Sequence, residues 1–203
     1  MKIKIISDST CDLSAQMIAE NNITLSPLTV IKNDEQFKDG VTITPADIFA
    51  HVAAGGSLCT TAANSIGEYA DIFEKYSADY DGIIMITIGS GFSACYQNAC
   101  LAAEDFPNVR VVDSRNLTTG QGLLVLKACE LAKTAEDLDV LAEAIRDLTE
   151  KVEVSFVVDK LDYLVKGGRC SSAAALGANL LNLKPCIDVK DGKMGVSKKY
   201  RGK

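Results

Sequence analysis

The chain has 203 residues, of which 47% are apolar and 24% charged, values typical of a globular protein with a hydrophobic core. Its net charge of −6 argues against non-specific binding to nucleic acid. No apolar run reaches the roughly 18 residues that a membrane span needs, and the first residues lack the apolar segment of a signal peptide. We therefore expect a cytoplasmic protein that is not integral to a membrane.

Seven cysteines are spread along the chain, an odd number, and they include no Cys-x-x-Cys pair. This spacing supports neither a zinc site nor a disulfide framework. We expect the cysteines to be small buried or half-buried thiols in a reducing compartment, and we expect no bound metal.

Short extended segments alternate with helices through the first 150 residues. The expected extended segments cover residues 2–7, 23–31 with a break at Pro27, 37–43, 58–61, 82–88 and 109–112. The expected helices cover residues 13–21, 44–54, 64–76, 92–104, 116–132 and 135–151. This alternation predicts an α/β fold with a parallel sheet that is sandwiched by helices.

The pattern changes after about residue 150. Beyond it we expect a strand at 152–158, helices at 159–165 and 171–181, and a hairpin of strands 185–189 and 193–197. The pair Asp191-Gly192 between the last two strands is a strong signal for a tight antiparallel turn. We therefore predict two domains: residues 1–150 form a parallel α/β domain that carries the binding site, and residues 151–203 form the first part of a second α/β domain.

The stretch Gly89–Ala99 joins the most apolar expected strand to a helix. Gly89 and Gly91 allow a tight turn, and Ser90 and Ser93 lie in this turn and at the start of the helix. The first backbone N–H groups of a helix have no partner within it, and they lie at the positive end of the helix dipole. A strand–turn–helix unit of this kind predicts a binding site for an anion.

Polar residues also follow other expected strands. The four segments are Asp8-Ser9-Thr10, Thr60-Thr61, Ser90 with Ser93, and Asp113-Ser114. In a parallel sheet the carboxyl ends of the strands share one edge, where ligands commonly bind. The alternative interpretation is that these residues only cap helices. We expect a ligand site at this edge, next to the four segments.

The usual sequence signals of catalysis are missing. Around Ser93 the sequence reads Gly-Phe-Ser-Ala-Cys, which lacks the second glycine of a hydrolase elbow, and neither common nucleotide-binding glycine pattern occurs. His51 lies inside an expected helix without an evident serine or cysteine partner. We predict no catalytic residue, which leaves either binding without chemistry or an enzyme whose remaining parts lie elsewhere.

The segment Lys166-Gly-Gly-Arg169 lies between two expected helices. Its two glycines allow the left-handed backbone that often ends a helix. Arg169 then precedes the next helix, where the dipole disfavours a lone cation. Two alternatives stay open for Arg169: a carboxylate or phosphate partner, and a side chain that points to solvent.

Six ordered blocks of the sequence form a further pattern. They are Ser7-Asp-Ser-Thr-Cys-Asp-Leu13, Asp39-Gly-Val-Thr-Ile-Thr-Pro45, Ser90-Gly-Phe-Ser-Ala-Cys-Tyr-Gln97, Val112-Asp-Ser114, Leu161-Asp-Tyr-Leu-Val-Lys-Gly-Gly-Arg169 with Ala173–Ala175, and Leu181-Asn-Leu-Lys-Pro185. In this order and at this spacing, the blocks resemble the DegV family of bacterial fatty-acid-binding proteins over the whole length of the chain.

The resemblance implies a two-domain α/β fold with a long-chain fatty acid buried between the domains. It implies a non-catalytic carrier that presents the carboxylate to a separate ATP-dependent fatty acid kinase, which makes an acyl phosphate for phospholipid synthesis. It also implies that Thr61 and Ser93 hold the carboxylate, and that Arg169 lies near the site or on the kinase-facing surface. The fatty acid is then the ligand, and no cofactor is required.

Two departures from the family pattern affect the expected site. The family's usual Thr-Ser-Gln-Pro-Ser reads Thr61-Ala-Ala-Asn-Ser65 in this chain. The chain also stops at Lys203, before the late His-containing segment that helps to bind the carboxylate in the family, and His51 does not replace that residue. We therefore expect a truncated second domain, with weaker retention of the ligand or pairing with another chain.

Two other functions stay open at this point. One is an enzyme subunit that acts on a small phosphorylated or keto substrate at the same edge of the sheet. The other is a ligand-free, truncated interaction protein. Release of a fatty acid when the purified protein is extracted with organic solvent would favour the carrier over both.

Overall fold

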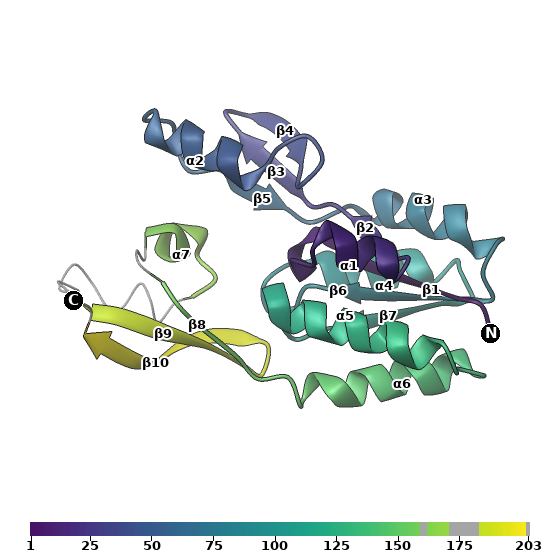
Figure 1. The fold of residues 1–203 in the computed structure, drawn as a ribbon. Helices are drawn as coiled ribbons and strands as arrows, with labels where there is room; N and C mark the ends of the chain where they lie inside the picture. Colours follow the sequence, from purple (N-terminus) through teal and green to yellow (C-terminus); the bar gives the residue numbers. More distant parts are fainter. Residues whose placement is uncertain (159–161, 171–182, 202–203) are drawn as a thin grey trace.

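The structure is a computed structural model that describes residues 1–158, 162–170 and 183–201. These residues form one parallel and two antiparallel β-sheets, with helices packed around the parallel one (Figure 1). In this part of the chain, no helix combines the length and the apolar character that crossing a membrane requires. All seven cysteines are free thiols, and five of them are buried.

The central sheet is parallel, with the strand order β2-β1-β6-β7. Its strands are β1 (Ile3–Asp8), β2 (Thr24–Ser26), β6 (Gly82–Thr87) and β7 (Val109–Asp113). All six residues of β6 are buried, as expected for a central strand with helices on both faces of its sheet. The predicted parallel α/β core is therefore confirmed.

Helices cover both faces of this sheet (Figure 1). They are α3 (Ile66–Ser77), α4 (Cys95–Ala103), α5 (Thr118–Ala132) and α6 (Leu138–Thr149), while the short η1 (Ser9–Cys11) and α1 (Ala15–Glu20) follow β1. Successive side chains of a strand point to opposite faces. Ile86 of β6 accordingly belongs to a core with α5 and α6, and Met85 belongs to a core with α3 and α4.

A small antiparallel sheet, with the strand order β4-β3-β5, lies beside α2 (Figure 1). Its elements are β3 (Thr29–Lys32), β4 (Glu35–Lys38), α2 (Pro45–Ala53) and β5 (Thr60–Ala62). Pro27 has no backbone N–H to donate to a neighbouring strand, and it separates β2 from β3. The chain therefore leaves the parallel sheet here, and the extended segments of residues 29–62 lie outside that sheet.

The third sheet follows residue 150 and is antiparallel, with the strand order β10-β9-β8. Its elements are β8 (Val154–Val157), α7 (Asp162–Gly167), β9 (Leu183–Lys190) and β10 (Lys193–Arg201). The predicted hairpin is confirmed, because β9 and β10 pair across Asp191 and Gly192, which both have positive φ angles. The division into domains at 1–150 and 151–203 stays a prediction, and the helix expected at 171–181 lies outside the described residues.

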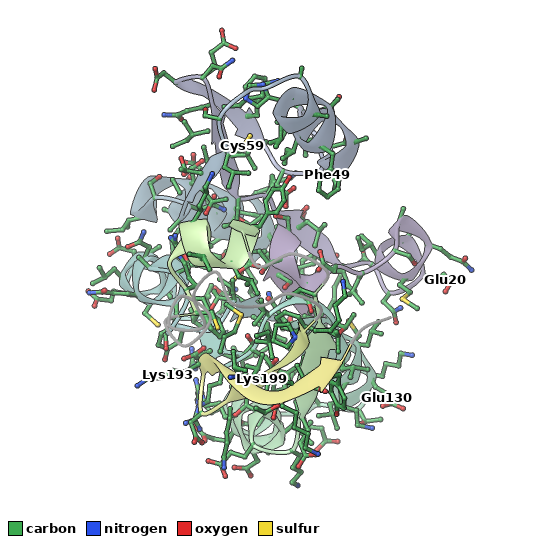
Figure 2. The ribbon with its side chains drawn as sticks, turned by 90° about the vertical axis from the view of Figure 1, so that its left-hand side faces the viewer. Glu20, Phe49, Cys59, Glu130, Lys193 and Lys199 are labelled. Atoms are coloured by element: carbon green, nitrogen blue, oxygen red, sulfur yellow. The ribbon has the colours of Figure 1, made fainter. Side chains whose placement is uncertain are left out.

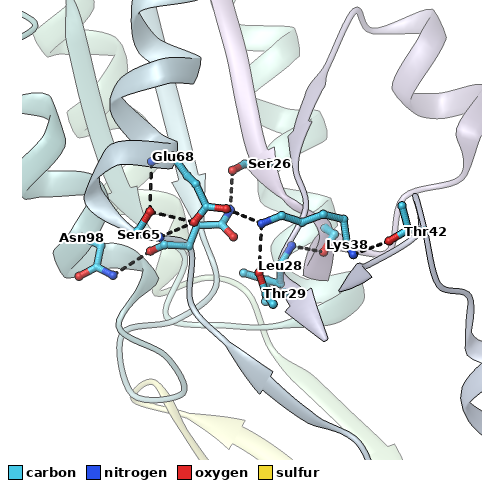
Figure 3. Close-up of polar contacts among 10 residues, drawn as sticks. Ser26, Leu28, Thr29, Lys38, Thr42, Ser65, Glu68 and Asn98 are labelled. Carbon is cyan, nitrogen blue, oxygen red and sulfur yellow. Dashed lines mark hydrogen bonds and ion pairs between the residues drawn. The ribbon is translucent and has the colours of Figure 1, made fainter. Parts of the chain in front are cut away.

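Lys38 and Glu68 connect the small sheet to the helices of the parallel sheet (Figure 3). The Lys38 ammonium on β4 forms an ion pair with Glu68 on α3 and donates to the Thr29 hydroxyl at 3.0 Å. Glu68 also accepts the backbone N–H of Ser65 at 2.8 Å, which completes a capping box at the start of α3. One carboxylate therefore stabilises both the helix start and the position of the neighbouring sheet.

We expect Glu68→Gln to weaken this connection. Burial raises the pKa of Glu68, but the interactions with Lys38 and Ser65 outweigh burial and lower the pKa below its ordinary value of 4.5. The stabilisation is therefore present above about pH 4.5 and is lost as the pH falls through the lowered pKa. Because the pair is partly exposed, the variant should lose only about 0.5 kcal/mol at pH 7. Urea denaturation at pH 7 and pH 3.5 measures this loss, and an equal difference at both pH values would contradict the expectation.

Candidate functional site

The turn after β6 is held at the carboxyl edge of the parallel sheet by Asp113, at the end of β7. Asp113 accepts the backbone N–H of Ser90 at 3.0 Å and the hydroxyl of Ser90 at 2.5 Å. The N–H of Gly89 donates to the carbonyl of Asn116 at 2.8 Å. The predicted turn is therefore confirmed, and the Ser90 hydroxyl is already engaged by a carboxylate of the protein.

Ser93 lies half-buried between this turn and α4. The helix begins at Cys95, later than predicted, because the turn extends to Phe92, whose N–H donates to the carbonyl of Gly89. The Ser93 hydroxyl oxygen accepts the N–H of Cys95 at 3.3 Å and lies 3.1 Å from the sulfur atom of that residue. A hydroxyl at the amino end of a helix suits an anionic group.

Thr61 lies in β5, so the prediction that it follows a strand of the parallel sheet is wrong. After α2 the chain returns beside β3, where Thr61 pairs with Val30 in antiparallel orientation. The residue is exposed, and its hydroxyl makes no hydrogen bond to another described residue. The Thr61 hydroxyl can therefore donate to a ligand without losing a bond within this part of the chain.

Two asparagines, Asn64 and Asn98, connect the segments that carry Thr61 and Ser93. Asn98 of α4 donates to the carbonyl of Asn64 at 2.8 Å, and the Asn64 side chain donates to the Ser26 hydroxyl at 2.7 Å. Asn64 closely follows Thr61 in sequence, and Asn98 closely follows Ser93. The two candidate hydroxyls are not bonded to each other, but the bond from Asn98 to Asn64 connects the segments that carry them.

Arg169 reaches the same turn from the end of α7. Gly168 has a φ angle of 70°, which a glycine adopts without strain, and it ends the helix as the sequence predicted. The exposed Arg169 guanidinium donates to the carbonyl of Gly167 at 2.6 Å and to the carbonyl of Phe92 at 3.5 Å. Its partners among the described residues are backbone carbonyls, and the second of them lies directly before Ser93. The structure thus brings Arg169 to the turn that carries Ser93.

The third sheet also contacts the turn, through two glycines. A Cβ atom on Gly91 would lie 2.2 Å from the carbonyl oxygen of Gly192, which belongs to the turn between β9 and β10. No side chain fits at this distance, so a glycine at position 91 allows the hairpin to approach the turn. The turn between β9 and β10 therefore packs against the turn that carries Ser93.

Asp8, at the end of β1, is buried in a hydrogen-bond network and is not open to a ligand. It accepts the N–H of Ile88 at 2.6 Å, the side chain of Gln121 at 2.9 Å and the N–H of Thr10 at 3.2 Å. Burial raises the pKa of Asp8, and these hydrogen bonds oppose the shift. This segment therefore joins β1, β6 and α5, and the capping interpretation describes it better than the ligand interpretation.

A polar cleft of about 760 Å³ lies between the start of α5, the end of α6 and the strands β8 and β9. Arg115 and Glu150 line it and form an ion pair at 3.4 Å. None of the three predicted site residues lines this cleft. Its charged walls also disfavour an acyl chain, so we place the candidate site at the Gly-Ser turn and not in the cleft.

Exposed apolar side chains lie on α2 and α7. Phe49 of α2 (Figure 2) is 61% exposed and Tyr163 of α7 is 43% exposed. Their rings meet edge to face with centroids 6.3 Å apart. Val165 of α7 is also exposed. These three side chains offer apolar surface close to the helix that precedes Arg169.

The described residues contain no group of three or more His, Cys, Asp or Glu side chains that could hold a metal ion. His51 lies in the last turn of α2. Its ring packs against Gly56, where a Cβ atom would lie within 2.5 Å of three ring atoms. This position gives His51 a packing role at the end of α2.

The chain is similar to known sequences over its whole length. A family model described as "Uncharacterised protein, DegV family" matches residues 2–203. A DegV domain-containing protein from Clostridium perfringens is 36% identical over 203 residues, which cover 99% of this chain and 73% of that protein. A DegV domain-containing protein from Deinococcus radiodurans is 32% identical over 203 residues, which cover 100% of this chain and 72% of that protein.

Several solved structures are similar along the whole chain. A DegV family protein from Thermus thermophilus, described by its fatty acid binding, has a TM-score of 0.91 and 31% identity, and the match covers 100% of this chain and 72% of that one. A stearic acid-binding protein from Eubacterium ventriosum has a TM-score of 0.88 and 30% identity, with 99% and 71% covered. The family model spans nearly every residue, and the fold agrees with these neighbours, so this chain belongs to the DegV family.

Proposed function

We propose that this chain is a carrier that binds a long-chain fatty acid, with the carboxylate at Thr61 and Ser93 and with Arg169 beside them. The observation that carries this proposal is the contact of Arg169 with the carbonyl of Phe92, which brings a cation to the residue directly before Ser93. The related structures that name a fatty acid or stearic acid as their ligand support the same class of ligand.

The hydrogen bonds that the two serine hydroxyls already make explain why Ser93, and not Ser90, would hold the anion. The Ser90 hydroxyl donates to Asp113, and a second carboxylate beside that one would be repelled. Among the described residues, the Ser93 hydroxyl contacts only neutral groups of Cys95, and the Thr61 hydroxyl has no partner. Both can therefore donate to a carboxylate, and such charge-assisted hydrogen bonds are strong.

The acyl tail would supply most of the binding energy. Each methylene that leaves water contributes about 0.8 kcal/mol, so a long acyl chain gains on the order of 10 kcal/mol. The exposed side chains of Phe49, Tyr163 and Val165 offer apolar surface for such a chain.

The proposed role is non-catalytic and cytoplasmic. In the described part of the chain, the Ser93 hydroxyl bonds to a thiol and a backbone N–H, and neither is a base that would turn it into a nucleophile. We propose that the bound carboxylate is presented to a separate ATP-dependent fatty acid kinase, which forms the acyl phosphate. The exposed guanidinium of Arg169 would then lie on the surface that this partner meets.

Replacement of both hydroxyls tests the carboxylate site. Ser93→Ala combined with Thr61→Ala is expected to weaken oleate binding more than about tenfold, because a hydrogen bond to a charged group contributes about 1.5–3 kcal/mol. Isothermal titration with oleate measures the change. Thr60→Ala is the matched control, since Thr60 is the exposed neighbour of Thr61 on the same strand. An unchanged affinity in the double variant would overturn the assignment of these residues.

Extraction of the purified wild-type chain tests the ligand class itself. Organic solvent should release a long-chain fatty acid that mass spectrometry identifies. A chain that releases none and does not bind added oleate would not be a fatty acid carrier.

A further inference from the structure

Tyr69 places a polar atom in the core between α3 and the parallel sheet. Its side chain is fully buried, and its hydroxyl has no hydrogen-bond partner of ordinary geometry among the described residues. Buried hydroxyl groups nearly always have partners, because losing water without gaining a hydrogen bond costs stability. A phenylalanine would fill the same space without this cost, so the hydroxyl needs an explanation.

The polar neighbour of this hydroxyl is the thiol of Cys95, at the start of α4, which is also fully buried. Burial, and then the nearby thiol, raise the pKa of Tyr69, and burial raises the pKa of Cys95. Both groups therefore keep their protons at neutral pH. They are available as hydrogen-bond donors, and not as a charged base or a reactive thiolate.

The sulfur atom of Cys95 connects the buried hydroxyl to Ser93. It accepts the hydroxyl of Ser93 at 3.1 Å, and the oxygen of that hydroxyl accepts the backbone N–H of Cys95 at 3.3 Å. The backbone N–H of Asn64 and the Tyr69 hydroxyl both act to lower the pKa of Cys95, as donors near its sulfur do. The sulfur thus lies close to the buried Tyr69 hydroxyl and accepts the hydroxyl of half-buried Ser93.

We propose that Tyr69 and Cys95 are positioning residues that orient the Ser93 hydroxyl toward a bound carboxylate. A carboxylate only accepts hydrogen bonds, so Ser93 must direct its single hydroxyl proton at the ligand. Its oxygen then accepts the S–H of Cys95, and the sulfur accepts the O–H of Tyr69. Each proton stays on its own heavy atom and only changes direction, so no covalent bond is broken.

This chain of donors makes the site selective for a charged head group. Hydrogen bonds in a row polarise one another, so the buried Tyr69 hydroxyl strengthens the outermost bond, from Ser93 to the ligand. The gain is larger for a carboxylate than for a neutral group of the same size, because charge-assisted hydrogen bonds are the stronger ones. The inference rests on the proposed function, in which Ser93 binds the carboxylate of a fatty acid.

A double-mutant cycle between Tyr69→Phe and Ser93→Ala tests the inference, with oleate and oleyl alcohol as probes of equal chain length. Tyr69→Phe should weaken oleate binding about fivefold and leave the binding of oleyl alcohol nearly unchanged. In the Ser93→Ala background, Tyr69→Phe should have no further effect on oleate. Cys95→Ala should reproduce the loss, and Cys95→Ser, which keeps a donor, should retain most of the affinity.

Tyr76→Phe is the matched control, because Tyr76 lies on the same helix and its hydroxyl accepts a hydrogen bond from Thr24 at 3.1 Å. Thermal unfolding of each variant shows that the binding measurements are made on folded protein. Equal losses for both probes, or a Tyr69→Phe effect that persists without the Ser93 hydroxyl, would overturn the inference and leave the proposed function intact. A wild-type chain that binds neither probe would overturn both.

Discussion

Asp8→Ala should lower the free energy of unfolding by about 3 kcal/mol. The Asp8 carboxylate is the acceptor for buried donors on three different segments, among them the N–H of Ile88 and the side chain of Gln121. Alanine leaves these donors without an acceptor, at a cost of about 1–3 kcal/mol each, and the cost of burying the carboxylate partly offsets this loss. Urea denaturation at pH 7 measures the effect. Asp71→Ala, which removes an exposed carboxylate on α3, is the control and should change stability little.

The effect of Asp8→Ala should also depend on pH in a defined direction. Because burial raises the pKa of Asp8 above its ordinary value of 3.8, the folded chain binds a proton in a pH range in which the unfolded chain has released it. Wild-type stability therefore rises, relative to the variant, as the pH falls through the raised pKa toward 3.8. The difference between wild type and variant should be larger at pH 4 than at pH 8. A constant difference would contradict the raised pKa.

Gly91→Ala should displace the β9–β10 hairpin from the turn that carries Ser93. The new Cβ atom would lie 2.2 Å from the carbonyl oxygen of Gly192, which is far inside the contact distance of the two atoms. Overpacking of this kind costs about 1–3 kcal/mol. If the site lies at this junction, oleate binding should also fall about tenfold, which corresponds to about 1.4 kcal/mol.

Hydrogen exchange and oleate titration measure these two effects. Amides of β9 and β10 should exchange faster in Gly91→Ala than in the wild type. Gly195→Ala is the matched control, because Gly195 lies in β10 and a Cβ atom there meets nothing within 4 Å. Unchanged exchange in Gly91→Ala would show that the hairpin does not depend on this contact.

Elements with strong local signals could be predicted well. Such signals are the isoleucine run of β6, Thr44 and Pro45 at the start of α2, and Asp191 with Gly192 between β9 and β10. These signals act between near neighbours in sequence, through burial of a continuous apolar segment, helix capping and turn geometry. They therefore do not depend on which distant segment packs against the element.

The sheet to which a short strand belongs could not be predicted. Thr60–Ala62 has three residues and no periodicity that distinguishes a parallel from an antiparallel neighbour. The partner of this strand is β3, and the pairing depends on the path of the chain after Pro27. The family resemblance implies that Thr61 is a site residue, but the expectation that it lies at the edge of the parallel sheet is wrong.

The turn at residues 89–92 can likewise be predicted from the sequence only in part. From the order of amino acids alone, the strand, the glycines and the helix that follows are evident, because each is encoded by adjacent residues. Which of its two serines is available to an anion depends on Asp113, and the approach of Arg169 depends on where α7 packs. Tyr69 likewise lies beside Cys95 only because α3 and α4 pack on the same face of the sheet. The sequence of α3 predicts that its tyrosine is buried, but not which polar atom of another helix it contacts. Contacts between distant segments come from the packing of whole elements, and the candidate site consists of such contacts.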